Sequence, residues 1–354
     1  LTYEEVTWEK YMGNWHEPRI IPAGNDLTLY EISKSKEILK HNYDNVFTID
    51  ESKHKYGNPD LRELTTLLRF YCTEIEALRG KPVIGYYASS GQWSMGYTEI
   101  DKEDTENMES AIVNKIPVNV EGVDFILSSP GGHIESSFQL SKIIRKRFKQ
   151  LSFLLPGSVY SCATAMTFCG DEIIMQSNSH LAPINPRING IDTYVGKQDF
   201  KIYSRYKIFA PWALKYLNEA KIAENGVKMN TLVLIEKLVF KRAHDMLSKY
   251  LFKVHKLSLF ERIKTRRKIT KIVNFFFKFE NHLSHVMPFF DDEVLEVGLP
   301  IKKANPELDV LLRKIRYICE EITTSRWLNG DALFFVRKIY FSSKDCHTLR
   351  YMPE

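Results

Sequence analysis

The sequence predicts an α/β fold built around a mostly parallel sheet. Of its 354 residues 44% are hydrophobic and 26% are charged, which excludes a disordered or low-complexity chain and allows a large buried core. Short apolar runs typical of buried strands alternate with stretches of helical periodicity. Two of the strand-to-helix turns carry glycine or serine. Because consecutive parallel strands need a crossover, this alternation indicates βαβ units.

Each expected element rests on its local pattern. Apolar residues at spacings of three and four over 60–79 predict the first helix, and the unbroken apolar run 82–88 predicts a buried strand. The remaining expectations are strand 123–127, helix 134–148, strand 152–155, helix 161–169, strand 172–175, a helical region 211–280, a short α/β return at 291–302, a helix 306–323 and an extended tail.

Charge is concentrated in one segment. The net charge is +5, but residues 237–278 hold thirteen Lys or Arg and two acids, a local balance of +11 that leaves about −6 for the rest. A solvated helical face is the simplest interpretation. The segment could instead cover an active site, lie on an anionic membrane surface or contact nucleic acid.

Other features suggest the cellular setting. No apolar run approaches the roughly 20 residues that cross a bilayer, and no signal peptide is recognisable. The five cysteines are odd in number and irregularly spaced, which argues against a disulfide framework or a zinc site. We therefore expect a soluble cytoplasmic protein, or one that is peripheral at the inner face of the membrane.

Two turns carry the candidate chemistry. Pro130-Gly131-Gly132 follows the strand at 123–127, and Ser161 begins a helix of small residues after the strand at 152–155. Each alone fits an ordinary strand–helix turn, with Ser161 as a helix N-cap. Together they suggest a nucleophile that faces backbone amides able to stabilise an oxyanion.

The motifs around these turns resemble a known family. The matching runs are Pro130-Gly131-Gly132, Ser161-Cys162-Ala163-Thr164, Asp171-Glu172-Ile173-Ile174-Met175, Leu181-Ala182-Pro183-Ile184-Asn185-Pro186 and Ser284-His285-Val286-Met287-Pro288. They are similar to those of the serine dehydrogenase proteinase family, which belongs with signal-peptide peptidase A in the Clp protease/crotonase superfamily. The resemblance implies a Clp protease/crotonase-type βαβ core with helical additions over 61–302, which includes the basic helical region 211–280. Residues 1–60 and 303–354 would be extensions.

The resemblance also implies a serine peptidase that acts on peptides or on unfolded or membrane-derived segments. Ser161 would be the nucleophile, and the amides of Gly131 or Gly132 and of Cys162 would bind the oxyanion. No cofactor or metal is implied. A homo-oligomer is implied, and an unidentified protein partner is a further possibility.

The general base is the open question. Ile184 stands near the place of the Clp protease histidine, so a Ser-Lys mechanism is expected, with a lysine that burial keeps neutral. Lys241, beside Phe240 and Leu238, is the chosen base. The alternatives are Lys237, Lys221, Lys215 and His180.

Competing interpretations keep the fold and change the function. The chain could be a catalytically weak scaffold that binds peptides in a larger complex, or it could carry crotonase-like acyl-thioester chemistry. Asn185, where the family has aspartate, leaves catalytic efficiency open. His282 and His285 could suggest a metal, but two histidines without a third ligand are more often structural.

Overall fold

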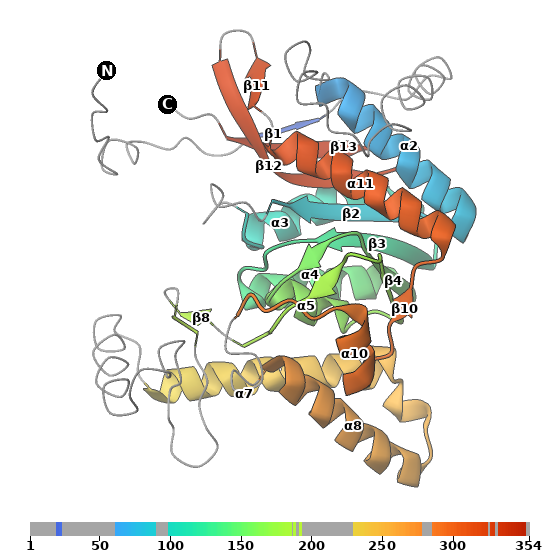
Figure 1. Ribbon diagram of the computed structural model, residues 1–354, viewed down its shortest axis with the longest axis vertical. Coiled ribbons are helices and arrows are strands. Elements are labelled where there is room, and N and C mark those ends of the chain that lie inside the picture. Colours follow the sequence, from blue (N-terminus) through green and yellow to red (C-terminus); the bar gives the residue numbers. More distant parts are fainter. Residues whose placement is uncertain are drawn as a thin grey trace.

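The computed structural model describes residues 19–22, 61–89, 98–185, 187–188, 191–192, 229–277, 285–324, 326–329 and 332–351. Within these ranges a nine-stranded sheet forms the centre of the molecule, with helices on both of its faces (Figure 1).

The sheet order is β1-β13-β12-β2-β3-β4-β6-β10, with β11 paired to β12. From β2 to β10 all neighbours are parallel, whereas β12 runs antiparallel to β2 and to β13. The strands are β1 (Arg19–Pro22), β2 (Val83–Ala88), β3 (Gly122–Ser128), β4 (Gln150–Leu155), β6 (Glu172–Met175), β10 (Lys302–Lys303), β11 (Arg326–Asn329), β12 (Ala332–Ser342) and β13 (Cys346–Tyr351). Two small ribbons, β5 (Ser158–Val159) with β7 (His180–Leu181) and β8 (Arg187–Ile188) with β9 (Ile191–Asp192), lie outside it.

The helices form two layers. They are α2 (Leu61–Arg79), α3 (Lys102–Asn107), α4 (Ile134–Arg147), α5 (Cys162–Thr167), α7 (Met229–Met246), α8 (Leu259–Phe277), α10 (Asp291–Val297) and α11 (Pro306–Thr324), with short π or 3₁₀ turns at Met108–Ile112, Val113–Lys115, Leu247–Leu251 and Val254–Lys256. One core lies between the sheet and α2 with α11, and the other between the sheet and α4, α5, α7 and α8.

Side chains along each central strand point alternately to the two faces of the sheet, so each strand contributes residues to both cores. In β2, Ile84 and Tyr86 join the core under α4, whereas Val83 and Tyr87 join the core under α2. All six residues of β2 are buried, as expected for a parallel strand that is covered on both faces. This explains why the strands read as unbroken apolar runs in the sequence.

These features confirm the predicted fold class, an α/β core of βαβ units around a mostly parallel sheet with helical additions. Among the described residues, the expected core strands and helices form, with boundaries that shift by a few residues at most. Of the expected helical region 211–280, residues 211–228 and 278–280 lie outside the described residues. The C-terminal extension is more than the expected helix and tail, because β12 and β13 continue the central sheet past β2.

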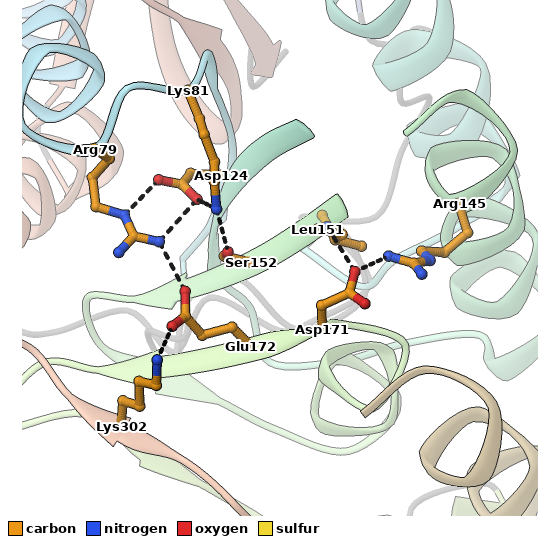
Figure 2. Close-up of polar contacts among 9 residues, drawn as sticks. All are labelled: Arg79, Lys81, Asp124, Arg145, Leu151, Ser152, Asp171, Glu172 and Lys302. Atoms are coloured by element: carbon orange, nitrogen blue, oxygen red, sulfur yellow. Dashed lines mark hydrogen bonds and ion pairs between the residues drawn. The ribbon is translucent and has the colours of Figure 1, made fainter. Parts of the chain in front are cut away.

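Ion pairs tie the amino ends of the central strands to the helices (Figure 2). Asp124 in β3 is fully buried and accepts a hydrogen bond from Arg79 at the end of α2, 2.7 Å from Nε to Oδ2. The same guanidinium reaches Glu172 in β6 at 2.9 Å, and Lys302 reaches that carboxylate at 2.6 Å. Although burial opposes ionisation, the hydrogen bonds from Lys302 and Arg79 hold the pKa of Glu172 at about 2.

Candidate active site

Ser161 occupies a strained turn between a strand and a helix. It follows β5 and directly precedes α5, with φ 54° and ψ −128°. Among the described non-glycine residues only Ser161 and Lys253 have a positive φ. Such strain gathers at functional sites, and a sharp strand-to-helix turn of this kind exposes the nucleophile in serine hydrolases. Ser161 is partly exposed.

The glycine turn packs directly on Ser161, as the sequence suggested. A Cβ on Gly131 would lie 2.6 Å from Ser161 Cβ and 2.8 Å from Tyr160 O. Backbone hydrogen bonds join the two turns, from Tyr160 N–H to Ser129 O at 2.9 Å and from Ser129 N–H to Ser158 O at 3.1 Å. Tertiary packing therefore brings together two motifs that lie about thirty residues apart in the chain.

The predicted oxyanion donors differ in their present partners. The Gly131 N–H donates to Ser129 Oγ at 3.1 Å, so an oxyanion would have to replace that hydroxyl as its acceptor. Within the described residues, the N–H groups of Gly132 and Cys162 donate to no backbone or side-chain oxygen, although the Gly132 N–H contacts the Cys162 sulfur. Both amides, on either side of the Ser161 turn, are candidates to donate to an oxyanion.

The Cys162 thiol is a packed group. Its side chain is buried, and burial raises its pKa to about 12, although hydrogen bonding with Ser137 and the Gly132 backbone opposes this shift. A thiol with so high a pKa stays protonated near neutral pH and is a poor nucleophile. The thiol is therefore disfavoured as a nucleophile, and Ser161 remains the nucleophile candidate.

A short segment before α3 braces the glycine turn. Ile100 N–H donates to Gly131 O at 2.7 Å, and His133 N–H donates to Ile100 O at 2.8 Å. The contact is so close that a Cβ on Gly132 would lie 2.2 Å from Ile100 N. Gly132 is therefore required for close backbone approach as well as for its φ of 148°.

This brace rests on a buried lysine that no sequence motif indicated. Lys338 in β12 has a side chain that is 1% exposed, and its ammonium donates to Glu99 O at 2.8 Å, Asp101 Oδ2 at 3.0 Å and Asp104 Oδ2 at 2.9 Å. Tyr340 Oη donates to the other oxygen of Asp104. The only signal in the sequence was a lysine inside the apolar run of β12.

Asp104 has an unusual environment. Burial raises its pKa to about 6, although the neighbouring Lys338 opposes this shift. Its side chain also accepts the N–H of Asp101, while Asp101 accepts the N–H of Asp104, which forms a capping box at the start of α3. Lys338 and Asp104 thus hold the Glu99–Asp101 backbone that positions the Gly131–Gly132 turn.

The burial expected of Lys241 is wrong. Lys241 and Lys237 are both exposed on α7, whereas Val239 and Ala243 face the core. An exposed ammonium lacks the desolvation that would make it a neutral base. Lys215 and Lys221, the other lysine candidates, lie outside the described residues.

His180 has a different partner. Its Nε2 lies 2.9 Å from Tyr160 Oη, and its pKa is lowered by burial and by the nearby Arg316. The imidazole is therefore neutral near pH 7 but faces Tyr160. Among the described side chains, none makes a hydrogen bond to Ser161 Oγ, so this part of the chain supplies no base in contact with the nucleophile.

Residues 285–289 pack against residues 181–185. The ring of His285 is buried, with Nδ1 3.1 Å from Asn185 Oδ1, and Phe289 exchanges two backbone hydrogen bonds with Leu181. The sequence favoured a structural role for His285, and this buried contact with Asn185 is consistent with that role. His282 lies outside the described residues, and no group of three potential metal ligands occurs among those the structure describes.

Comparison with known proteins gives similarities of limited extent. No family model matches the chain. Two uncharacterized proteins of Methanocaldococcus jannaschii are similar, one 24% identical over 211 residues (60% of this chain and 63% of that protein) and one 28% identical over 119 residues (32% and 40%). The chain thus spans less than two thirds of either relative. Among solved structures, a mutant of the 1510-N membrane-bound stomatin-specific protease is similar at 12% identity, with a TM-score of 0.35, over 64% of this chain and 82% of that one.

Proposed function

We propose that the chain is a serine peptidase that cleaves peptides or unfolded segments. The observation that carries this proposal is the strained Ser161 turn, which packs against Gly131 and is partly exposed. Backbone strain in a well-packed core persists only where the surroundings enforce it. A serine that merely capped a short helix would not need a positive φ.

The proposed chemistry is acyl transfer. Ser161 Oγ attacks the scissile carbonyl carbon and loses its proton to a base, while the carbonyl π electrons move onto the oxygen. The N–H groups of Gly132 and Cys162 receive that oxyanion. The amine leaves with the proton, and water then hydrolyses the acyl-enzyme. Each preorganised donor of this type contributes roughly 10²–10³-fold to the rate.

We propose a lysine as the base. Lys237 and Lys241 are exposed, so either would need to be desolvated by bound substrate or by a second copy of the chain. We test them together with Lys215, Lys221 and His180, each changed singly to methionine or, for the histidine, to alanine. The base is the residue whose replacement abolishes acylation while the variant stays folded, as measured by circular dichroism.

An active-site-directed fluorophosphonate tests the nucleophile. We expect it to label the wild-type chain and not Ser161→Ala, with the label located by mass spectrometry on the peptide that contains residue 161. Ser110→Ala, which removes an exposed serine from another turn, is the matched control and should label normally. Labelling that survives Ser161→Ala would overturn the proposal.

A catalytically weak peptide-binding scaffold is the second candidate. It is favoured by the engaged Gly131 amide and by the absence, among the described side chains, of a hydrogen-bonded partner for Ser161 Oγ. In that case the fluorophosphonate would fail to label the wild-type chain, while unfolded peptides would still bind and would bind equally to Ser161→Ala.

We also propose that the chain forms a homo-oligomer, since a partner copy could desolvate the exposed lysines of α7. Light scattering at micromolar concentration should give a multiple of the 41.3 kDa chain mass. A strict monomer would contradict this part of the proposal.

A further inference from the structure

The beginning of α8 exposes three large apolar side chains. Leu259 is 77% exposed, Phe260 79% and Ile263 49%. They occupy one face of the first turn, since residues at spacings of one and four lie within roughly 100° of each other around a helix. In Figure 1 this end of α8 projects at the lower right, away from the sheet. Isolated exposed apolar residues are ordinary, but a cluster on a projecting helix end indicates a partner.

Basic side chains surround this cluster. Lys264 follows Phe260 by four residues, while Arg266 and Arg267 follow Ile263 by three and four, which places them on the next turn of the same side. All three are exposed, and within the described residues no acidic group pairs with them. We call Leu259, Phe260, Ile263, Lys264, Arg266 and Arg267 together the α8 tip.

The tip is held in place by its own contacts. Glu261, the single acid between Lys253 and Lys271, accepts hydrogen bonds from the Ser258 hydroxyl at 2.6 Å and the Ser258 N–H at 3.1 Å. Arg262 donates to Leu257 O at 2.7 Å and to His255 O at 2.9 Å, which ties the preceding turn to the helix. The apolar and basic groups are therefore presented on a preorganised end.

The far half of α8 anchors this projection in the core. Ile269, Ile272, Val273 and Phe276 are fully buried, and Phe276 O accepts the N–H of Ile184 at 2.8 Å. The helix therefore connects the exposed tip rigidly to the segment that follows β7. A surface that binds the tip would therefore also orient the core to which α8 is anchored.

The composition of the tip decides between possible occupants. Residues 253–271 contain eight Lys or Arg and one acid, a balance of +7, so two copies that met through this surface would repel each other. Nucleic acid would match the charge but would leave Leu259 and Ile263 without apolar partners. An anionic bilayer matches both, since apolar side chains enter the acyl boundary while basic groups meet the headgroups.

We propose that the α8 tip docks the protein on an anionic lipid bilayer. Leu259, Phe260 and Ile263 insert into the interfacial layer, and Lys264, Arg266 and Arg267 contact the headgroup phosphates. No helix in the described part of the chain is long and apolar enough to span a membrane, so binding through the tip would be peripheral. This inference does not depend on the peptidase activity of Ser161.

Vesicle sedimentation of the full chain tests the proposal. We expect binding to phosphatidylcholine vesicles that contain phosphatidylglycerol, and little binding to phosphatidylcholine alone. The triple variant Leu259→Ser/Phe260→Ser/Ile263→Ser should bind at least about tenfold more weakly, because each insertion is lost. Val118→Ser/Leu295→Ser/Val310→Ser, which removes exposed apolar groups elsewhere, is the matched control and should bind like wild type.

The charge contribution is tested separately. Lys264→Gln/Arg266→Gln/Arg267→Gln should weaken binding and reduce its dependence on salt, whereas Lys142→Gln/Lys146→Gln on the surface of α4 should not. All five native cysteines are buried, so Phe260→Cys can be labelled selectively with an environment-sensitive fluorophore. Its emission should shift to the blue when anionic vesicles are added.

Three outcomes would overturn the proposal. Equal vesicle binding by the tip variant and its control would show that another surface binds lipid. Binding of oligonucleotides but not of vesicles would identify a nucleic-acid surface. A fall in solution mass on changing the tip, without an effect of vesicles, would identify a contact between copies of the chain.

Discussion

Gly131 lies so close to Ser161 that a Cβ on the glycine would stand 2.6 Å from Ser161 Cβ and 3.3 Å from its Oγ. No side chain larger than hydrogen fits there without displacing the hydroxyl. Gly131 also has φ 95°, a conformation that L-residues with a Cβ rarely adopt. The closeness of the two backbones thus makes Gly131 a sensitive probe of the Ser161 turn.

Gly131→Ala should therefore lower the rate of fluorophosphonate labelling at Ser161 by about 10²-fold or more, since displacement of a reacting group by about 1 Å costs that much. Gly80→Ala is the matched control, because Gly80 also has a positive φ, 67°, but a Cβ on it would meet nothing within 4 Å. It should lose about 1–2 kcal/mol of stability and keep the labelling rate. Equal labelling rates in the two variants would show that the contact between Gly131 and Ser161 does not affect the reaction.

Replacing Lys338 tests the buried brace. Lys338→Met leaves Asp104 buried without its cation, and the free energy of unfolding should fall by about 3–5 kcal/mol in urea titrations. Adding Asp104→Asn should restore part of the loss, because the uncompensated charge is then removed. Lys344→Met, at an exposed lysine of the same hairpin, should stay within about 0.5 kcal/mol of wild type. If the double variant is no more stable than the single one, charge burial is not the cause.

The cysteines should be inert in the native protein. All five are buried, and burial raises the pKa of Cys162 to about 12. A maleimide should therefore modify no thiol in native protein near neutral pH and five thiols in denaturant, as counted by mass spectrometry. Cys162→Ala should still react with the fluorophosphonate at Ser161. Loss of fluorophosphonate labelling in a folded Cys162→Ala variant would indicate that the Cys162 thiol takes part in the reaction.

Protonation of Glu172 should account for part of the loss of folding stability at acid pH. Its pKa of about 2 lies below the ordinary value of 4.5, so its ionisation stabilises the fold above about pH 4.5 and this contribution is lost as the pH falls toward 2. Glu172→Gln should lower the unfolding free energy by roughly 2 kcal/mol near pH 7 and by much less near pH 3. Glu121→Gln, which breaks an exposed pair with Lys149, should have little effect at either pH. A Glu172→Gln deficit that does not change with pH would argue against the ion pairs of Figure 2.

Much of the core could be predicted from local patterns. Strands that are buried on both faces, such as β2 and β3, appear as unbroken apolar runs, and α2 and α11 show apolar residues at spacings of three and four. The two turns at Gly131 and Ser161 were visible because glycine and serine interrupt those patterns.

The exposure of Lys241 illustrates where local reasoning failed. Apolar neighbours in the sequence suggested burial, but Val239, Ala243 and Leu247 recur at a spacing of four and define the face of α7 that packs on the core. Lys241, two residues from either Val239 or Ala243, lies on the opposite side. Neighbours in sequence along a helix are not neighbours in space.

The sequence by itself determined which segments become strands and helices, and it marked Ser161 and the glycine turn, because these depend on residues near one another in the chain. Only the tertiary structure decided that β12 joins the sheet beside β2, that Lys338 is buried against Asp104, and that Gly131 meets Ser161. These relationships join residues far apart in the chain. They depend on how packed surfaces and buried charges find partners, which no local pattern of residues encodes.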